Sequence, residues 1–441
     1  MSINNMIRLS GALALAASHL GAFAQDAAPE NWNAHFQSTY ISQRKPALHS
    51  PYEGPNSLES QAEQSYSLTA TAALGLRLAS GTELYLDPEV TQGKPISHLQ
   101  GLAGFSNGEL AKTSGSQAKL YLARFFLRQS WALGDESRGE GAPVASSANQ
   151  LAGQYAQRRV VLTVGKLSAL DLFDANSLAH DPRTQFMNLA LSTHGAYDYP
   201  ADARGYTNGV ALEYFDAGWT LRAARFAEPR SPNQLPLDMH LLKHYGDQIE
   251  ATRDYSFGGQ SGTVRLMAFH MRALMSSYED ALASSGVPEL ATVRDHEQDK
   301  WGAGVDIEHQ LSHDLGLFLR AFRADGRTET YAFMEADASF SSGVVLHGPS
   351  WGRADDTVGL AFASSSLSAE HQAYLARGGL SFFLGDGQLH YQAERDLEAY
   401  YSAAVGRGLS LSLDAQRIIN PGYNADRGPA KFFAVRLHWE L

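Results

Sequence analysis

The sequence predicts an all-β fold: a transmembrane, antiparallel β-barrel of about 16 strands (16 or 18), with short periplasmic turns and long extracellular loops. Apolar and polar residues alternate with a period of two along many stretches, and several of these stretches are long. A tilted strand needs about 9–11 residues to cross a bilayer, whereas strands of soluble proteins are usually about 5–6 residues long. The chain also ends on such a stretch, as outer-membrane barrels do.

The clearest alternation runs from Tyr66 to Leu78, where an apolar residue occupies every second position and mostly polar or small residues lie between. Leu409 to Gln416 follows the same pattern. On a helix these apolar residues would point in all directions, whereas on a strand they share one face. Weak alternation near Phe36 and Val344 leaves the strand count open between 16 and 18.

Short turns and long loops alternate along the chain. Glycine or aspartate supplies tight turns such as 216–218 and 406–408, whereas long polar segments cover 91–118, 166–204 and 273–300. This asymmetry is typical of outer-membrane barrels. A soluble β-propeller or β-helix is the alternative fold, but both need an internal repeat of fixed period, and the sequence has none.

The two ends of the chain predict export and barrel closure. Residues 1–24 form a predicted signal peptide, with Arg8, an apolar stretch over 9–20 and an Ala22-Phe23-Ala24 cleavage site, so 25–441 is the expected barrel domain. At the other end, 433–441 alternates up to Leu441. We expect the barrel assembly machinery to recognise this last strand, although Leu441 replaces the usual aromatic residue.

Composition excludes several functional classes. The chain has no cysteine, so disulfides, thiolate metal sites and cysteine nucleophiles are impossible. Its net charge of −12 argues against nucleic acid as a partner. No serine lies in a Gly-x-Ser-x-Gly elbow, and the sequence therefore gives no reason to expect an enzyme. We expect no cofactor and no metal site.

A series of recognisable segments follows in a fixed order along the chain. The segments are LYLDPEVTQG (84–93), GLAGFSNGE (101–109), ARFFLRQ (123–129), DPRTQFMN (181–188), GAYDYPADARGYTNG (195–209), 301–330, 351–362, 384–387 and 420–441. Taken in this order, they resemble the carbohydrate-selective porin family (OprB-like porins). The resemblance implies a 16-stranded outer-membrane barrel through which sugars diffuse. The opening segment 36–58 is similar to a branch of porins associated with high-affinity manganese uptake.

The strand pattern predicts which charged residues face the lumen. Arg124 and Arg128 share the face opposite Tyr121 and Phe125, and we expect them to point inward. The other residues expected on the inner face are Arg222, Asp306, Glu308 and Arg320. Together they would form an arginine–carboxylate lattice around the pore wall. The alternative is that these charges only solvate and brace a polar barrel interior.

The long segment 166–204 carries further candidates: Asp181, Arg183, Asp198, Asp202 and Arg204. It could fold into the pore as a constriction or lie over it as an extracellular cap. Asp174 and Asn176 alternate as ligands of hard cations do, but the full calcium-loop spacing is absent.

Three functions remain open from the sequence. The first is diffusion of small sugars through a water-filled outer-membrane pore, the second is selective uptake of divalent manganese, and the third is a structural or interaction barrel. The expected partners are small solutes, outer-membrane lipid and the assembly machinery, and the sequence does not determine the oligomeric state.

Overall fold

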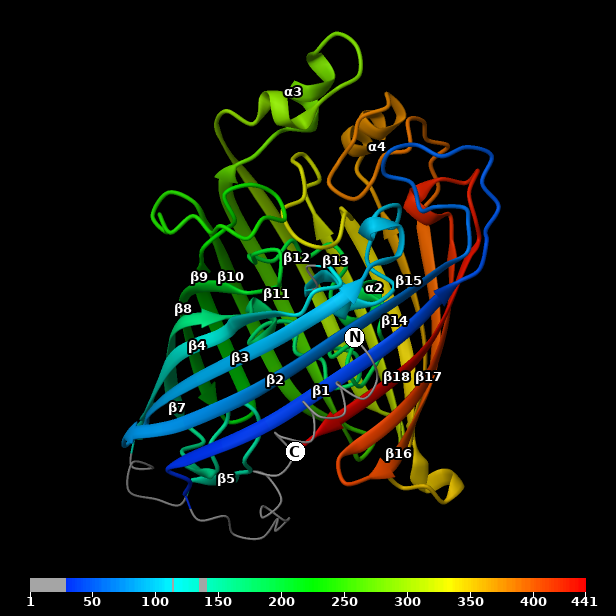
Figure 1. Ribbon diagram of the computed structural model, residues 1–441. Coiled ribbons are helices and arrows are strands. Elements are labelled where there is room, and N and C mark those ends of the chain that lie inside the picture. Colours follow the sequence, from blue (N-terminus) through cyan, green and yellow to red (C-terminus); the bar gives the residue numbers. More distant parts are fainter. Residues whose placement is uncertain (1–28, 113–114, 135–140) are drawn as a thin grey trace.

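The protein is a closed, antiparallel barrel of 16 strands (Figure 1). The structure is a computed structural model that describes residues 29–112, 115–134 and 141–441. The predicted fold class is confirmed, and the predicted signal peptide (1–24) lies outside the described residues. The barrel strands are β1 (Trp32–Lys45), β2 (Glu63–Ala79), β3 (Thr82–Lys94), β4 (Lys119–Ala132), β7 (Arg159–Leu167), β8 (Thr207–Asp216), β9 (Trp219–Phe226), β10 (Tyr245–Phe257), β11 (Gln260–Leu274), β12 (Glu297–Gln310), β13 (Leu315–Ala324), β14 (Ala338–His347), β15 (Thr357–Ser366), β16 (Glu394–Gly406), β17 (Leu409–Ile419) and β18 (Ala430–Glu440).

Closure joins the two ends of the chain. β1 pairs with β18 along Gln37 to Arg44, and the two weakly alternating stretches near Phe36 and Val344 are strands β1 and β14. Pairing of the first and last strands leaves no open sheet edge, which lipid could not satisfy with hydrogen bonds. Apolar side chains cover the outer face, as with Leu411 and Leu413 on β17, while polar residues between them are buried inside.

The helices are short and lie in the connections. They are α2 (Leu189–Ser192), α3 (Tyr278–Ala283) and α4 (Ala369–Ala376), with 3-10 turns η1 (Ile96–Leu99), η2 (Gly108–Lys112), η4 (Ala169–Asp171), η5 (Leu290–Val293), η6 (Gly348–Trp351) and η7 (Pro421–Tyr423). Within the described part of the chain, no helix has the length and apolarity needed to span a membrane.

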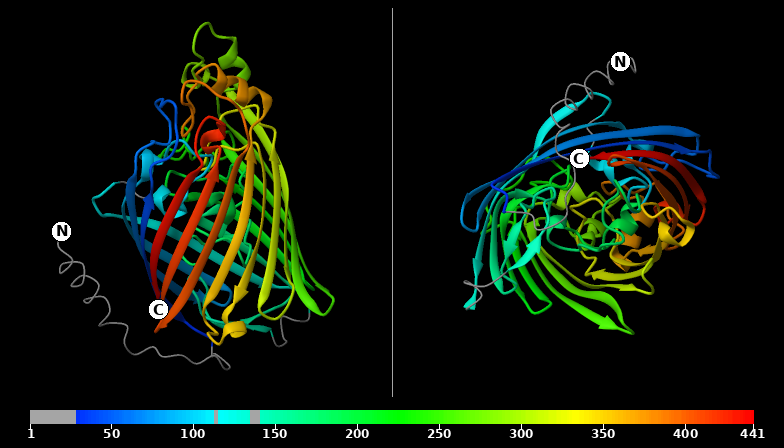
Figure 2. Two further views of the ribbon diagram at one scale, coloured as in Figure 1. Left: turned by 90° about the vertical axis from the view of Figure 1, so that its right-hand side faces the viewer. Right: turned by 90° about the horizontal axis from the view of Figure 1, so that it is seen from below.

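Long loops gather at one end of the barrel, and the C-terminus lies at the other end with the short turns (Figures 1 and 2). We call these the outer and periplasmic ends, following the general asymmetry of such barrels. One periplasmic connection departs from the pattern. The chain between β4 and β7 carries a small sheet, β5 (Ala142–Val144) and β6 (Gly153–Tyr155). It also reaches the inner wall, where the Asn149 amide donates to Asp87 at 2.9 Å.

The segment 168–206 between β7 and β8 folds into the lumen, so it is an inserted segment and not an outer cap (Figures 1 and 2). Phe186, Met187 and Leu191 on this segment are completely buried. The Phe186 ring contacts Phe318 of β13 and Tyr400 of β16, with ring centroids 5.8 Å and 4.9 Å apart. The main hydrophobic core therefore lies inside the barrel, between the inserted segment and the wall.

A β-bulge corrects one prediction about β4. Asp87 of β3 lies opposite Arg124, whereas the next residue, Pro88, lies opposite Leu122, so β4 contains one extra residue. A proline has no N–H to donate to the sheet, which explains the bulge at this position. As a result Tyr121 points inward together with Arg124, and not to the opposite face as predicted. Phe125 faces outward as expected.

Two outer loops are joined by a buried histidine. His371 of α4 is completely buried, its Nδ1 lies 3.0 Å from Asp337, and its ring stacks on Tyr278 of α3 at 4.3 Å. Burial disfavours the charged imidazolium, but Asp337 and Glu335 outweigh it and raise the pKa of His371 to about 9. The charged imidazolium therefore stabilises this contact between the loops.

Alkaline conditions are expected to loosen α4. Because the pKa of His371 rises from 6.5 to about 9 in the folded loop, its contribution to stability is complete below pH 6.5 and is lost as pH rises to about 9. Hydrogen exchange of residues 369–376, corrected for intrinsic rates, should therefore accelerate between about pH 7 and pH 9. His371→Asn should remove this dependence, and a flat profile in the native protein would contradict the assignment.

Candidate functional site

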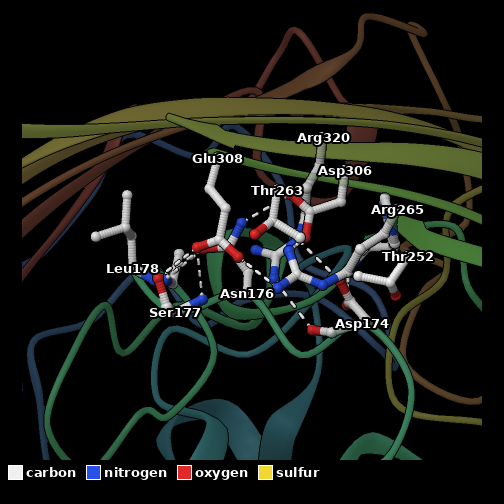
Figure 3. A network of polar contacts seen from close by, with 12 residues as sticks. Asp174, Asn176, Ser177, Leu178, Thr252, Thr263, Arg265, Asp306, Glu308 and Arg320 are labelled. Atoms are coloured by element: carbon white, nitrogen blue, oxygen red, sulfur yellow. Dashed lines mark hydrogen bonds and ion pairs between the residues drawn. The ribbon is translucent and has the colours of Figure 1, made fainter. Parts of the chain in front are cut away.

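The inserted segment is held against the wall by a buried ion pair (Figure 3). Arg320 of β13 donates from Nε to the carboxylate of Asp174 at 2.8 Å and from Nη1 to the carbonyl of Leu191 at 2.9 Å. Asp174 also accepts from the His194 N–H at 2.6 Å. Its φ of 57° lies in the left-handed region, which Asp tolerates better than most residues. These contacts fix the start of the inserted segment.

Neighbouring wall residues extend this anchor (Figure 3). The Asn176 amide donates to Asp306 at 2.7 Å, and the Ser177 N–H donates to Glu308 at 2.9 Å. Arg265 forms ion pairs with both of these carboxylates. Arg320, Asp306 and Glu308 therefore point inward as predicted, but the inserted segment covers them. The side chains of Arg320 and Asp306 are only 1% and 0% exposed, which is too little to line a water-filled path.

Other wall carboxylates accept hydrogen bonds from the backbone of the loops. Glu398 of β16 accepts from the N–H groups of Met187 and Asn188 at 2.6 and 2.9 Å. Glu394 accepts from Ala103 at 2.9 Å and from Gly422 at 2.6 Å. Backbone N–H groups buried in a lumen need such acceptors. Glu394 and Glu398 of this wall thus bind the backbone of the loops by hydrogen bonds.

The opposite side of the inserted segment faces β3 and β4 with cations and tyrosines. Arg183 donates to Glu89 at 2.9 Å and to Glu109 at 3.0 Å. Two tyrosine hydroxyls, those of Tyr121 and Tyr206, also donate to Glu89. We refer to Glu89, Glu109, Lys112, Tyr121, Arg124, Arg183 and Tyr206 as the cation–tyrosine cluster.

Arg124 joins this cluster to the first turn of the inserted segment. It donates from Nε and Nη2 to the two oxygens of Asp171 at 2.7 and 2.6 Å, a bidentate arrangement. Its guanidinium lies 5.4 Å from the centre of the Tyr206 ring. Guanidinium groups and aromatic faces at this separation attract one another. The ring and the cation are therefore held side by side.

The cations of the cluster are more exposed than the carboxylates. The side chains of Lys112, Arg124 and Arg183 are 13–22% exposed, whereas Glu89 and Glu109 are 0–1% exposed. The Asp171 side chain, which pairs with Arg124 from outside the cluster, is 27% exposed. Burial opposes ionisation of Glu109, but Arg183 and Lys112 lower its pKa to about 2. The cluster therefore presents positive charge toward the lumen at neutral pH.

A cavity of about 210 Å³ opens beside this cluster at the outer end. Lys112 and Arg204 supply its charges, and neither Asp nor Glu is among its lining residues. The Arg204 guanidinium also lies 4.5 Å from the centre of the Tyr121 ring. The rest of the lining is Leu99, Phe105, Ala111, Ala203, Asn233, Leu235, Phe333, Phe382 and Phe383. Aromatic faces and polar groups thus meet in one small space.

The remaining predicted residues have separate environments. Arg128 donates to the Asn149 carbonyl at 2.9 Å near the periplasmic end, and Arg222 pairs with Glu213 and Glu250 on the inner wall. Asp198 is buried beside Lys300 at 2.8 Å. Asp181 accepts from the N–H of Arg183, and Asp202 from those of Arg204 and Tyr206, so both brace turns. Of the predicted residues, Arg204 lines the cavity, and Arg124 and Arg183 belong to the cation–tyrosine cluster beside it.

Sequence reasoning missed most of the cation–tyrosine cluster. Glu89, Glu109 and Lys112 were not among the predicted site residues, although Glu83, Asp87 and Glu89 share one face of a strand-like stretch. In the sequence, Asp174 and Asn176 were weak candidates for ligands of a hard cation. In the structure, Asp174 accepts a hydrogen bond from Arg320, and Asn176 donates one to Asp306. Within the described ranges, no three His, Asp or Glu side chains gather to hold a metal ion.

The chain is similar to a known protein family and to solved barrel structures. The family model described as "Carbohydrate-selective porin, OprB family" matches residues 56–441. Among solved structures, the high-pH structure of Pseudomonas putida OprB aligns with a TM-score of 0.67 at 15% identity, covering 93% of this chain and 94% of that one. The outer membrane channel DcaP of Acinetobacter baumannii aligns with a TM-score of 0.52 at 10% identity, covering 96% and 100%. A comparison with curated protein sequences gives no match.

The fold of the barrel and the shape of its lumen together define the class of protein. A closed barrel with a polar lumen that an inward-folded segment narrows is the architecture of a porin, a channel for small solutes. The chain belongs to the carbohydrate-selective porin family, OprB. It is thus a channel through which sugars diffuse, and family membership implies an outer-membrane location.

Proposed function

We propose that single-ring sugars cross the barrel between the inserted segment and the wall formed by β3, β4 and β7. The observation that carries this proposal is the outer cavity and the cation–tyrosine cluster beside it, which share Lys112. The opposite wall is filled, because Phe186 packs there against Phe318 and Tyr400. A solute path on the β3–β4 side is the arrangement that this packing favours.

The chemistry of this wall suits a sugar. Sugar hydroxyls need both donors and acceptors, and the partly exposed Lys112, Arg124 and Arg183 supply donors while Asp171 supplies a partly exposed acceptor. The apolar faces of a sugar ring can lie against phenyl rings of the cavity lining such as those of Phe333 and Phe382. The cavity volume of about 210 Å³ is below the 300–1,000 Å³ of pockets for drug-sized ligands, which favours one sugar ring over two.

Filling the cavity is expected to slow sugar entry. Ala203 lines the cavity, so Ala203→Trp should reduce the rate at which liposomes containing the protein swell in a monosaccharide solution. Ala223→Trp is the matched control, because Ala223 faces outward on β9 and its change should leave the rate unaltered. Equal swelling of both variants and the native protein would place the path elsewhere. No swelling of the native protein in any sugar would contradict sugar diffusion itself.

We also propose that the chain is exported and assembled by signals at its two ends. Cleavage after Ala24 would release the barrel domain, and N-terminal sequencing of the mature protein checks this site. The last strand, β18, carries outward Phe433, Val435 and Leu437, a surface that the assembly machinery can recognise. Cross-linking from this strand during assembly tests that contact.

A further inference from the structure

The outward face of four neighbouring strands carries a row of cations at the outer end of the barrel. Arg395 on β16, Arg417 on β17, Lys431 on β18 and Arg44 on β1 are all exposed and stand on the same face as the apolar residues that cover the barrel. The strands are consecutive in the closed sheet. We call these four residues the cation row.

The sheet register places the members of the row next to one another. Arg417 lies directly opposite Lys431. Arg44 lies opposite Phe433, two positions from Lys431, and Arg395 is two positions from Leu397, which lies opposite Arg417. Side chains directly opposite or diagonal across strands can interact, and like charges directly opposite destabilise a sheet.

The cation row has no neutralising partner among the described residues. None of its four side chains forms an ion pair or a side-chain hydrogen bond with another residue in the described ranges. Two outward-facing arginines elsewhere at the outer end are paired. Arg225 pairs with Asp247 at 2.7 Å, and Arg272 pairs with Asp299 at 3.3 Å. The row therefore concentrates positive charge that lacks an acidic partner within this part of the protein.

A groove lies on the same outward face as the row. Its volume is about 500 Å³, and its lining includes Ser42, Arg44, Ala399, Leu413, Phe433 and Val435. Small side chains at Ser42 and Ala399 form hollows between the larger residues. Arg44 belongs to both the groove and the row, so the groove continues from the cations toward the middle of the barrel wall.

We propose that this face binds a lipid of the outer leaflet whose phosphate headgroup carries a net negative charge. The phosphate would be held by the cation row, and one acyl chain would lie in the groove. Arginine and lysine are the natural partners of phosphate, and cations close to a membrane surface attract anionic headgroups. The inference goes beyond sugar diffusion and rests only on the outer-membrane location.

Native mass spectrometry of the full barrel in detergent tests whether the cation row binds the lipid headgroup. With phosphatidic acid as the probe, we expect one lipid to stay bound and phosphatidylcholine with the same chains to bind at least about tenfold more weakly. Arg417→Gln/Lys431→Gln should weaken phosphatidic acid binding to that level. The matched control is Arg225→Gln/Arg272→Gln, which also removes two outward cations and should leave lipid binding unchanged. Equal loss in both double variants, or in neither, would overturn the proposal.

Two further experiments distinguish a bound lipid from a bound free anion. Ala399→Trp fills the groove and should weaken binding of long-chain phosphatidic acid but not of glycerol phosphate. If millimolar inorganic phosphate displaces the lipid completely, the row is a site for free anions and the lipid assignment is wrong. Loss of an oligomer in the row variants would instead make this face a subunit contact. Sugar-driven liposome swelling should be the same in all these variants, so a failure of sugar diffusion would be recognised separately.

Discussion

Replacing Arg320 with alanine is expected to open the channel and destabilise the barrel. The Arg320 guanidinium bonds to both Asp174 and Leu191, so its loss detaches the inserted segment from β13 at two points. The Asp174 carboxylate would remain buried without its main counter-charge. Removing one partner of such a buried pair costs about 3–5 kcal/mol. We expect higher single-channel conductance, faster passage of disaccharides and a lower melting temperature.

Two comparisons separate the role of this ion pair from general damage. Arg320→Lys keeps the charge but cannot reproduce the planar fork, so an intermediate effect is expected. Arg323→Ala removes an outward-facing arginine from the same strand and should change neither conductance nor stability appreciably. Unchanged conductance in a folded Arg320→Ala barrel would mean that the inserted segment does not depend on this contact.

Period-two alternation was enough to predict the barrel but not its details. Stretches such as Leu409–Ile419 alternate clearly because one face meets lipid and the other the lumen. β1 is weak in sequence because small and polar residues such as Ser38 and Ser42 share its outer face, and its pairing with β18 decides its structure. The bulge at Pro88 was detectable in principle, since proline inside a strand marks an irregularity.

The site was harder to predict because its contacts join distant parts of the chain. Asp174 and Arg320 are 146 residues apart, and no local pattern indicates that they meet. Alternation predicted that Glu308 faces the lumen, but not that it would accept a hydrogen bond from the backbone N–H of Ser177. The sequence therefore predicted which charged side chains face the lumen. It did not predict which of them remain exposed there and which are covered by the inserted segment and the loops.

That separation predicts the ion preference of the pore. Lys112, Arg124 and Arg183 are partly exposed, Glu89 and Glu109 behind them are covered, and Asp171 is the one partly exposed carboxylate beside them. The exposed charge is therefore net positive, and the passage should favour anions although the whole chain carries a net charge of −12. Cationic side chains at a constriction favour anions in this way. In planar bilayers with a salt gradient, the reversal potential of the native protein should indicate anion selectivity.

Arg124→Gln/Arg183→Gln is expected to shift this selectivity strongly toward cations. A unit charge about 4 Å from a passing ion contributes about 1 kcal/mol even in bulk water, a factor of about 5 in the permeability ratio, and two such charges are removed. Arg323→Gln/Arg395→Gln is the control with the same change of net charge, because both residues face outward and should not affect the reversal potential. If both double variants shift the potential equally, net charge and not the cation–tyrosine cluster sets the ion preference.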